Sequence, residues 1–252
     1  IQRIPTSSYI SSSPVITSID GKLCLVWGGD GLHVVDLQSP SLSELNGWPQ
    51  KGIKFFASSP AIADVDNDGV TEIFCGNDDH LLYGWKQDGS TLPGFPVATG
   101  GDVYSSPALA DLTGNGTKDI IFGSDDYKVY AVDHLGQHLP GWPIDTGHFV
   151  SASPTIGDID GDGKPEIVIG SWDKNLYVWK QDGTLVKGFP VKLGHIIWAS
   201  AALADLDGCS SPEIIVAADQ LYAFRNDGSI QPGFPVRMRS WTKSSPCIAD
   251  AD

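Results

Sequence analysis

Short apolar runs separated by turn residues recur along the whole chain, and none spaces its apolar residues at the 3.6-residue period of a helix. Residues 57–104 show the pattern. A run of small residues, SSPAIADV, precedes a polar loop, and the apolar runs EIFCG and LLYGWKQ follow. Asp88-Gly89 is a strong hairpin signal, and GFPVAT comes after it. The pattern therefore predicts four short strands.

This four-strand unit repeats with a period of about 47 residues. A Ser-Pro landmark recurs at Pro14, Pro60, Pro107, Pro154 and Pro246. Four strands at that period are typical of a β-propeller blade, so we expect one all-β propeller domain, 1–252, of four-stranded antiparallel blades. The five full units are expected at about 11–56, 57–104, 105–150, 151–198 and 199–242.

Two partial units flank the five full ones. Residues 1–8 align with the fourth strand of a preceding unit, and residues 244–252 align with the first strand of a sixth. The sixth unit stops inside an acidic motif at Asp250-Ala251-Asp252. Because a propeller ring needs whole blades, we expect the sequence to be a fragment of a longer chain.

Four units carry an acidic nine-residue loop between their first two strands. The loops are Asp64–Glu72, Asp111–Asp119, Asp158–Glu166 and Asp205–Glu213. Hard oxygen ligands on a glycine-bearing loop suit Ca²⁺. An alternative interpretation as simple Asx turns accounts for one aspartate per loop but not for three or four carboxylates. The loop of the first unit is two residues shorter, and no site is expected there.

The repeated Asp-x-Asp-x-Asp-Gly-x-x-Glu pattern, with a Gly-Phe-Pro or Gly-Trp-Pro triplet in each unit, resembles FG-GAP/VCBS-repeat propellers. That family includes the integrin α-subunit propellers, and the resemblance covers nearly the whole chain. It implies ligands at the side chains of loop positions 1, 3, 5 and 9 and at the carbonyl of position 7. These positions are Asp64, Asp66, Asp68, Val70 and Glu72; Asp111, Thr113, Asn115, Thr117 and Asp119; Asp158, Asp160, Asp162, Lys164 and Glu166; and Asp205, Asp207, Ser211 and Glu213.

The four loops differ in their ligand chemistry, and two to four calcium ions are expected. The second and fourth units each offer four carboxylates, whereas the third offers two. In the fifth unit Cys209 replaces the oxygen ligand of position 5, and a thiol is a poor ligand for a hard cation.

The composition favours a metal-binding globular protein. The net charge is −15, and 13 of the 31 acidic residues lie at these ligand positions. This charge argues against a nucleic-acid partner. No apolar stretch reaches the roughly 20 residues of a membrane span, so no membrane insertion is expected. The four cysteines lack zinc-type spacing, and they are read as buried thiols or as an inter-blade disulfide.

No catalytic motif is present in the sequence. Pairs such as Asp78-Asp79 and Asp125-Asp126 occupy equivalent places in the repeat. Repetition favours a structural turn over an acid–base pair, so we expect a protein that is not an enzyme.

Aromatic residues gather in the connections that lead into each first strand. In an antiparallel meander these connections lie on the face opposite the acidic loops. Rigidly held aromatic side chains can anchor a ligand, whereas packing between blades is the alternative. The expected ligand-binding residues are Tyr9, Phe56, Tyr104, Phe149, Trp198 and Trp241.

These patterns favour an extracellular or cell-surface module that is stabilised by calcium and acts in lectin-like binding or adhesion. Its expected ligand is a glycan or an extracellular protein. Calcium outside cells is concentrated enough to fill weak sites. The alternative is a polysaccharide lyase or another carbohydrate-active enzyme built on a similar calcium propeller.

Overall fold

The computed structural model describes residues 9–209 and 211–249, where every regular element is a β-strand. Within those ranges no helix is long and apolar enough to cross a membrane. The first sheet contains β1 (Val15–Ile19), β2 (Lys22–Gly28) and β3 (Leu32–Asp36). The second contains β4 (Ala61–Ala63), β5 (Glu72–Asn77), β6 (Leu81–Lys86) and β7 (Val97–Ala98).

The other three sheets repeat the four-strand order. The third contains β8 (Ala108–Ala110), β9 (Asp119–Ser124), β10 (Lys128–Val132) and β11 (Ile144–Asp145). The fourth contains β12 (Thr155–Gly157), β13 (Glu166–Gly170), β14 (Asn175–Trp179) and β15 (Val191–Lys192). The fifth contains β16 (Ala202–Ala204), β17 (Glu213–Ala217), β18 (Gln220–Phe224) and β19 (Val236–Arg237).

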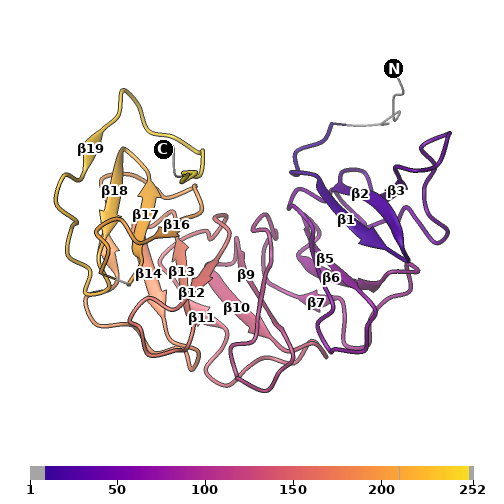
Figure 1. Cartoon of the computed structure of the whole chain (residues 1–252), viewed down its shortest axis with the longest axis horizontal. Helices are drawn as coiled ribbons and strands as arrows, with labels where there is room; N and C mark the ends of the chain where they lie inside the picture. The colour runs from indigo at the N-terminus through magenta and orange to yellow at the C-terminus, as the bar shows by residue number, and fades with distance from the viewer. Residues whose placement is uncertain (1–8, 210, 250–252) are drawn as a thin grey trace.

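The five sheets stand side by side in an open arc, with β1–β3 at one end and β16–β19 at the other (Figure 1). The first strands β4, β8, β12 and β16 contact one another in sequence, β4 with β8, β8 with β12 and β12 with β16, so they line the inner side of the arc. All strand pairs within the sheets are antiparallel. This arrangement confirms the predicted β-propeller fold.

Two details of the predicted blades are wrong. The first sheet has three strands, and its fourth is reduced to a single bridge between Leu32 and Gln50. The other units place an apolar residue such as Val97 at the position of Gln50. Residues 244–249 form no strand, because no second strand pairs with them in the described part of the chain. The strand expected at residues 1–8 lies outside the described residues.

The hydrophobic core lies between the sheets. Each of four buried clusters draws its side chains from two consecutive units. The second strands β5, β9, β13 and β17 are buried along their whole length, because both faces of each are covered by neighbouring sheets. Cys24 and Cys75 are buried free thiols of this core, and Cys209 and Cys247 are exposed and free.

A ladder of serines joins the units along the inner side of the arc. Each landmark serine donates its backbone N–H to the hydroxyl oxygen of its equivalent in the next unit, at 2.9–3.2 Å. The ladder runs through Ser13, Ser59, Ser106, Ser153, Ser200 and Ser245. The serine of the Ser-Pro landmark therefore provides an inter-blade hydrogen bond as well as a small side chain.

The Gly-aromatic-Pro triplet provides a second contact between units, nearer the outer edge. Its aromatic ring is buried, as in Phe95, and its glycine has a positive φ, +81° at Gly94. A Cβ atom at Gly94 would lie 1.8 Å from the carbonyl oxygen of Leu135, in the hairpin of the next unit. Only glycine permits this approach. Trp48 belongs to the same series, and its indole N–H donates to the carbonyl of Gln87 at 3.0 Å.

We expect Gly94→Ala to destabilise the fold more than Gly233→Ala, by about 1–3 kcal/mol in the free energy of unfolding. Both glycines have a positive φ, but no atom of the described residues lies within 4 Å of a Cβ built at Gly233. Backbone strain is common to both variants, so the difference between their unfolding free energies measures the effect of the inter-blade contact. Denaturant unfolding of both variants measures it, and equal losses would contradict the role of the contact.

Candidate functional site

The meander places the loops of each sheet on two opposite faces. The four acidic loops connect first to second strands, and we call their side the acidic-loop face. The turns between second and third strands lie on the other side, beside the connections between units. Backbone hydrogen bonds tie these turns to the connections, as from the Asp125 N–H to the Asp102 carbonyl at 2.9 Å. We call this side the connection face.

The fourth unit shows how an acidic loop is built. Asp158, Asp160 and Glu166 bring one carboxylate oxygen each within 4.8 Å of one another. Glu166 is fully buried, and its Oε2 accepts the Ile159 N–H at 2.8 Å. Its Oε1 is buried without a hydrogen-bond partner among the described residues. Burial raises the pKa of Glu166, and the charges of Asp160 and Asp162 raise it further.

The second unit repeats this geometry. Asp64, Asp66 and Glu72 form an equivalent triad, with their oxygens within 4.8 Å of one another. Glu72 accepts the Val65 N–H at 2.9 Å, and burial raises the pKa of Glu72. Here the buried oxygen without a partner in the described residues is Asp64 Oδ1.

The third unit keeps the buried ninth-position carboxylate with fewer acids around it. Asp119 is fully buried, and its Oδ2 accepts the Leu112 N–H at 2.9 Å. Its Oδ1 is buried and has no hydrogen-bond partner among the described residues. Asp111 accepts the N–H groups of Gly114 and Gly116 at 2.7 and 2.8 Å, so the loop backbone fixes its orientation.

The fifth unit combines a triad with one cationic and one uncharged hydrogen-bonding partner. Asp205, Asp207 and Glu213 hold one oxygen each within 4.8 Å. Asp207 also accepts a hydrogen bond from Gln231 at 3.1 Å and lies 3.7 Å from Arg225. The residue at position 210 lies outside the described residues. The metal-ligand roles of all four loops, including the carbonyls of Val70, Thr117, Lys164 and Ser211, stay predictions.

The residues of these loops fit a calcium ion. A buried carboxylate oxygen with neither a donor nor a cation loses several kcal/mol of hydration, roughly, without compensation. Such oxygens occur at equivalent points in the third and fourth loops, and the donor groups around them are oxygens. Oxygen-only donor sets of this kind select calcium over zinc or copper.

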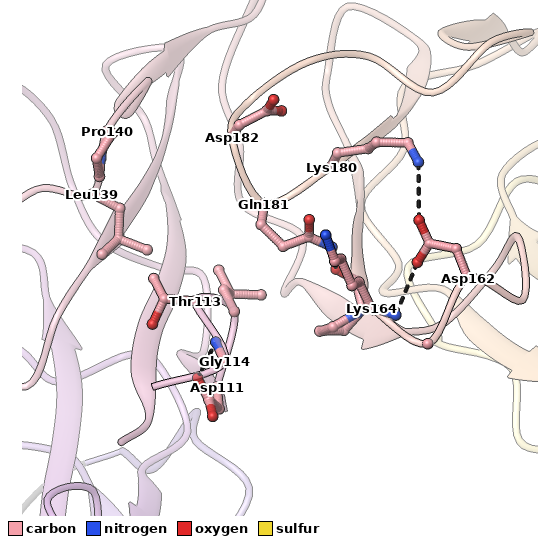
Figure 2. Close-up of a pocket in the computed structure, with 13 residues that line it drawn as sticks. Asp111, Thr113, Gly114, Leu139, Pro140, Asp162, Lys164, Lys180, Gln181 and Asp182 are labelled. Atoms are coloured by element: carbon pink, nitrogen blue, oxygen red, sulfur yellow. Dashed lines mark hydrogen bonds and ion pairs between the residues drawn. The ribbon is translucent and has the colours of Figure 1, made fainter. Parts of the chain in front are cut away.

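A cleft of about 730 Å³ lies between the third and fourth loops on the acidic-loop face (Figure 2). Asp111 and Thr113 line one side of it, and Lys180 and Asp182 line the other. Lys180 Nζ lies 3.4 Å from Asp162 and 2.9 Å from Asp160. The cleft therefore has carboxylates and an amine on the same wall.

On the connection face, aromatic rings form a continuous tract across the third to fifth units. Phe149 contacts Trp172, with ring centroids 5.2 Å apart, and Trp172 contacts Trp198 at 4.7 Å. Lys243 Nζ lies 3.7 Å from the centre of the Trp198 ring. Trp172 lies in a turn between the second and third strands of its unit, so it is not among the aromatic residues predicted from the connections. The meander places these turns and the connections on the same face.

Trp241 adjoins this tract through Lys243, whose Nζ lies 5.9 Å from the centre of the Trp241 ring. Trp241 is 44% exposed and stacks on His195, and Tyr104 is 38% exposed. Tyr9 is exposed as well. Phe56 is a correction: its side chain is fully buried in the core between the first two units, so it is not available to a ligand.

The paired aspartates of the turns have two different roles. The second of each pair is structural: Asp126 accepts the Gly100 N–H at 2.8 Å and the hydroxyl of Tyr130. The contacts confirm the turn interpretation for this position. The first of each pair, Asp78 and Asp125, is partly buried, and burial together with the charge of Asp102 raises its pKa to about 6.

Asp125→Asn should make the protein less sensitive to pH. The pKa of Asp125 is higher in the folded state, about 6, than in the unfolded chain, so its neutral form stabilises the fold at low pH. That stability is present below about pH 4 and is lost as the pH rises through 6. At pH 7.5 the variant should exceed the wild type by up to about 2 kcal/mol in unfolding free energy. Equal pH profiles would contradict this.

Comparison with known proteins agrees with this geometry. Residues 64–122 and 158–216 match the family model of the FG-GAP-like repeat. No curated protein matches the sequence.

Similar solved structures are β-propeller and repeat proteins. The V. cholerae biofilm matrix protein Bap1 is 20% identical, with a TM-score of 0.67 over 88% of this chain. BamB from Moraxella catarrhalis is 15% identical, with a TM-score of 0.64 over 90% of this chain. The WD40 propeller domain of Doa1 is 14% identical, with a TM-score of 0.61 over 95% of this chain and 72% of its own. The chain spans 38% of the Bap1 chain and 61% of the BamB chain.

Proposed function

We propose that this chain, in which two segments match the FG-GAP-like repeat, is an extracellular binding module stabilised by calcium. The observation that carries the proposal is the set of buried carboxylate oxygens without donors among the described residues, at position 9 of the third and fourth loops and at position 1 of the second. A cation supplies the missing partner. The proposed ligand is a glycan or an extracellular protein.

The protein's own groups prepare each loop for the ion. Backbone N–H groups hold the first and ninth carboxylates, as Gly163 holds Asp158 at 2.9 Å and Ile159 holds Glu166. The loop therefore needs little rearrangement to accept a cation. Calcium would neutralise the like charges and connect the first and second strands of the unit. The weaker third and fifth sites fit a compartment in which calcium is abundant.

Calcium should raise the melting temperature relative to chelator, because each filled site stabilises the fold by about 2.7 kcal/mol at 100 times its Kd. Asp160→Asn should reduce this rise, since it removes a ligand charge. Asp20→Asn is the matched control, because it removes the same charge from the loop of the first unit, where no site is expected. Melting curves that coincide with calcium and with chelator would refute calcium stabilisation.

The connection face is the proposed ligand surface. Its aromatic tract is carried by turns that hydrogen bonds fix to rigid strands, and aromatic anchors on rigid supports suit glycan stacking or a protein contact. The likeness to Bap1, a biofilm matrix protein, agrees with an extracellular setting.

Trp241→Ala should weaken ligand binding by at least tenfold while calcium still raises the melting temperature, because Trp241 is exposed on the connection face, away from the acidic loops. A glycan array and an array of extracellular proteins identify the ligand, and titration with that ligand measures the loss. Leu185→Ala, an exposed apolar residue in the hairpin after β14, is the control. Unchanged binding in Trp241→Ala, or an equal loss in Leu185→Ala, would contradict this assignment.

One observation favours the alternative of a carbohydrate-active enzyme. Asp102 lies 3.1 Å from His80 Nδ1 and 4.0 Å from Lys54, beside the carboxyl groups of Asp78 and Asp125. Carboxyl groups with a pKa about 6 beside basic residues are suited to proton transfer. Depletion of a polysaccharide by the wild type but not by Asp125→Asn would support the enzyme. Binding without depletion supports the binding module.

A further inference from the structure

The residue opposite the ninth loop position changes sign between units. Strand β5 places Glu72 directly across from Lys86. In the third and fourth sheets Val132 pairs with Ile120 and Trp179 pairs with Ile167, so the same register, continued by one residue, sets Asp133 opposite Asp119 and Lys180 opposite Glu166. Side chains paired across antiparallel strands lie about 5 Å apart on one face of the sheet. This cross-strand position therefore faces the acidic loop.

Contacts in two units show that the cross-strand side chain reaches the loop. Lys180 Nζ lies 2.9 Å from Asp160, at loop position 3. It also lies 3.4 Å from Asp162, at loop position 5 (Figure 2). In the fifth unit Arg225 lies 3.7 Å from Asp207, at loop position 3. These side chains therefore form ion pairs with carboxylates that a metal ion would coordinate.

The third unit reverses the charge at this position. Asp133 replaces the cation, at the position opposite Asp119. Four ligand carboxylates and one lysine give a net charge of −3 in the second and fourth units. Two ligand carboxylates and Asp133 give the same −3 in the third.

Turn formation alone does not require this charge. Asp133 Oδ1 accepts the N–H groups of Leu135 and Gln137, both at 2.9 Å, and these hydrogen bonds fix the carboxylate. An asparagine would accept both. Lys118 and Lys164 also lie in the loops, but neither is at the position where the sign reverses between units.

We propose that the cross-strand residue sets the cation affinity of its loop. Asp133 is a further acidic group of the third site and compensates for its two neutral ligands, Thr113 and Asn115. Lys180 is an internal cation that a bound metal ion must displace from Asp160 and Asp162. This inference rests on the proposed binding of calcium to the loops.

Calcium titration of Asp133→Asn, by competition with a chromophoric chelator at low ionic strength, tests the inference. A unit charge roughly 6–8 Å from a divalent ion changes affinity about 5–10-fold at the dielectric constant of water. Asp133→Asn should weaken one site by this factor, and Asp133→Lys should weaken it further. Lys180→Gln should strengthen a different site by a similar factor.

Two matched variants separate a local effect from a general one. Asp145→Asn removes the same charge from β11, on an edge strand, and should leave calcium affinity unchanged. In an Asp111→Ala background, where the third site is lost, Asp133→Asn should have no further effect on calcium binding. An equal effect in both backgrounds would contradict the inference, because it would place the action of Asp133 elsewhere.

The outcomes for this inference and for calcium binding itself are distinct. A wild-type protein that binds no calcium would refute the proposed calcium sites. A wild type that binds calcium, with Asp133→Asn binding it equally well at every site, would leave those sites intact and overturn the role of Asp133.

Discussion

The carboxylate that begins each second strand is the constraint on which the loop architecture depends. Glu72, Asp119, Glu166 and Glu213 are buried at the point where the loop enters the core. One oxygen of each closes the loop by accepting the N–H of the second loop position, at 2.8–2.9 Å. A carboxylate has two oxygens, and the second has no donor among the described residues at Asp119 and Glu166. Closing the loop therefore buries an oxygen for which the proposed calcium ion would be the partner.

Contacts between neighbouring units hold the sheets together as a rigid frame that supports the loops. The serine ladder joins neighbouring blades near the axis, and the Gly-aromatic-Pro triplets join them near the outer edge. The apolar clusters fill the space between these two contacts. Both contacts use residues that repeat in every unit. The loop residues that differ between units are not needed for these contacts, so they can give each face its own chemistry. Loops on a fixed frame are where binding specificity usually resides.

The repeat made most of the fold predictable, because each strand is short and bounded by its own turn signals. The loop positions were predictable for the same reason. The features that the sequence did not predict each involve one or two residues. The fourth strand of the first unit is reduced to a bridge at Gln50, where the other units have an apolar residue. Phe56 and Trp241 both lie in connections, yet one is buried and the other exposed, and only packing separates them. The contacts of Lys180 depend on strand register, which the loop sequence does not contain.

Equivalent loops on one frame need not be equivalent sites. Loop sequence alone ranks the third unit as much weaker than the fourth, because it supplies two carboxylates instead of four. Directly after the third strands of these two units, Asp133 and Lys180 carry opposite charges, and Lys180 contacts its loop. Coulomb interactions with a divalent ion extend over several ångströms, so these charges count together with the ligands. A comparison of cation affinity between loops must therefore include the charge of the cross-strand residue. A motif confined to nine consecutive residues omits that charge.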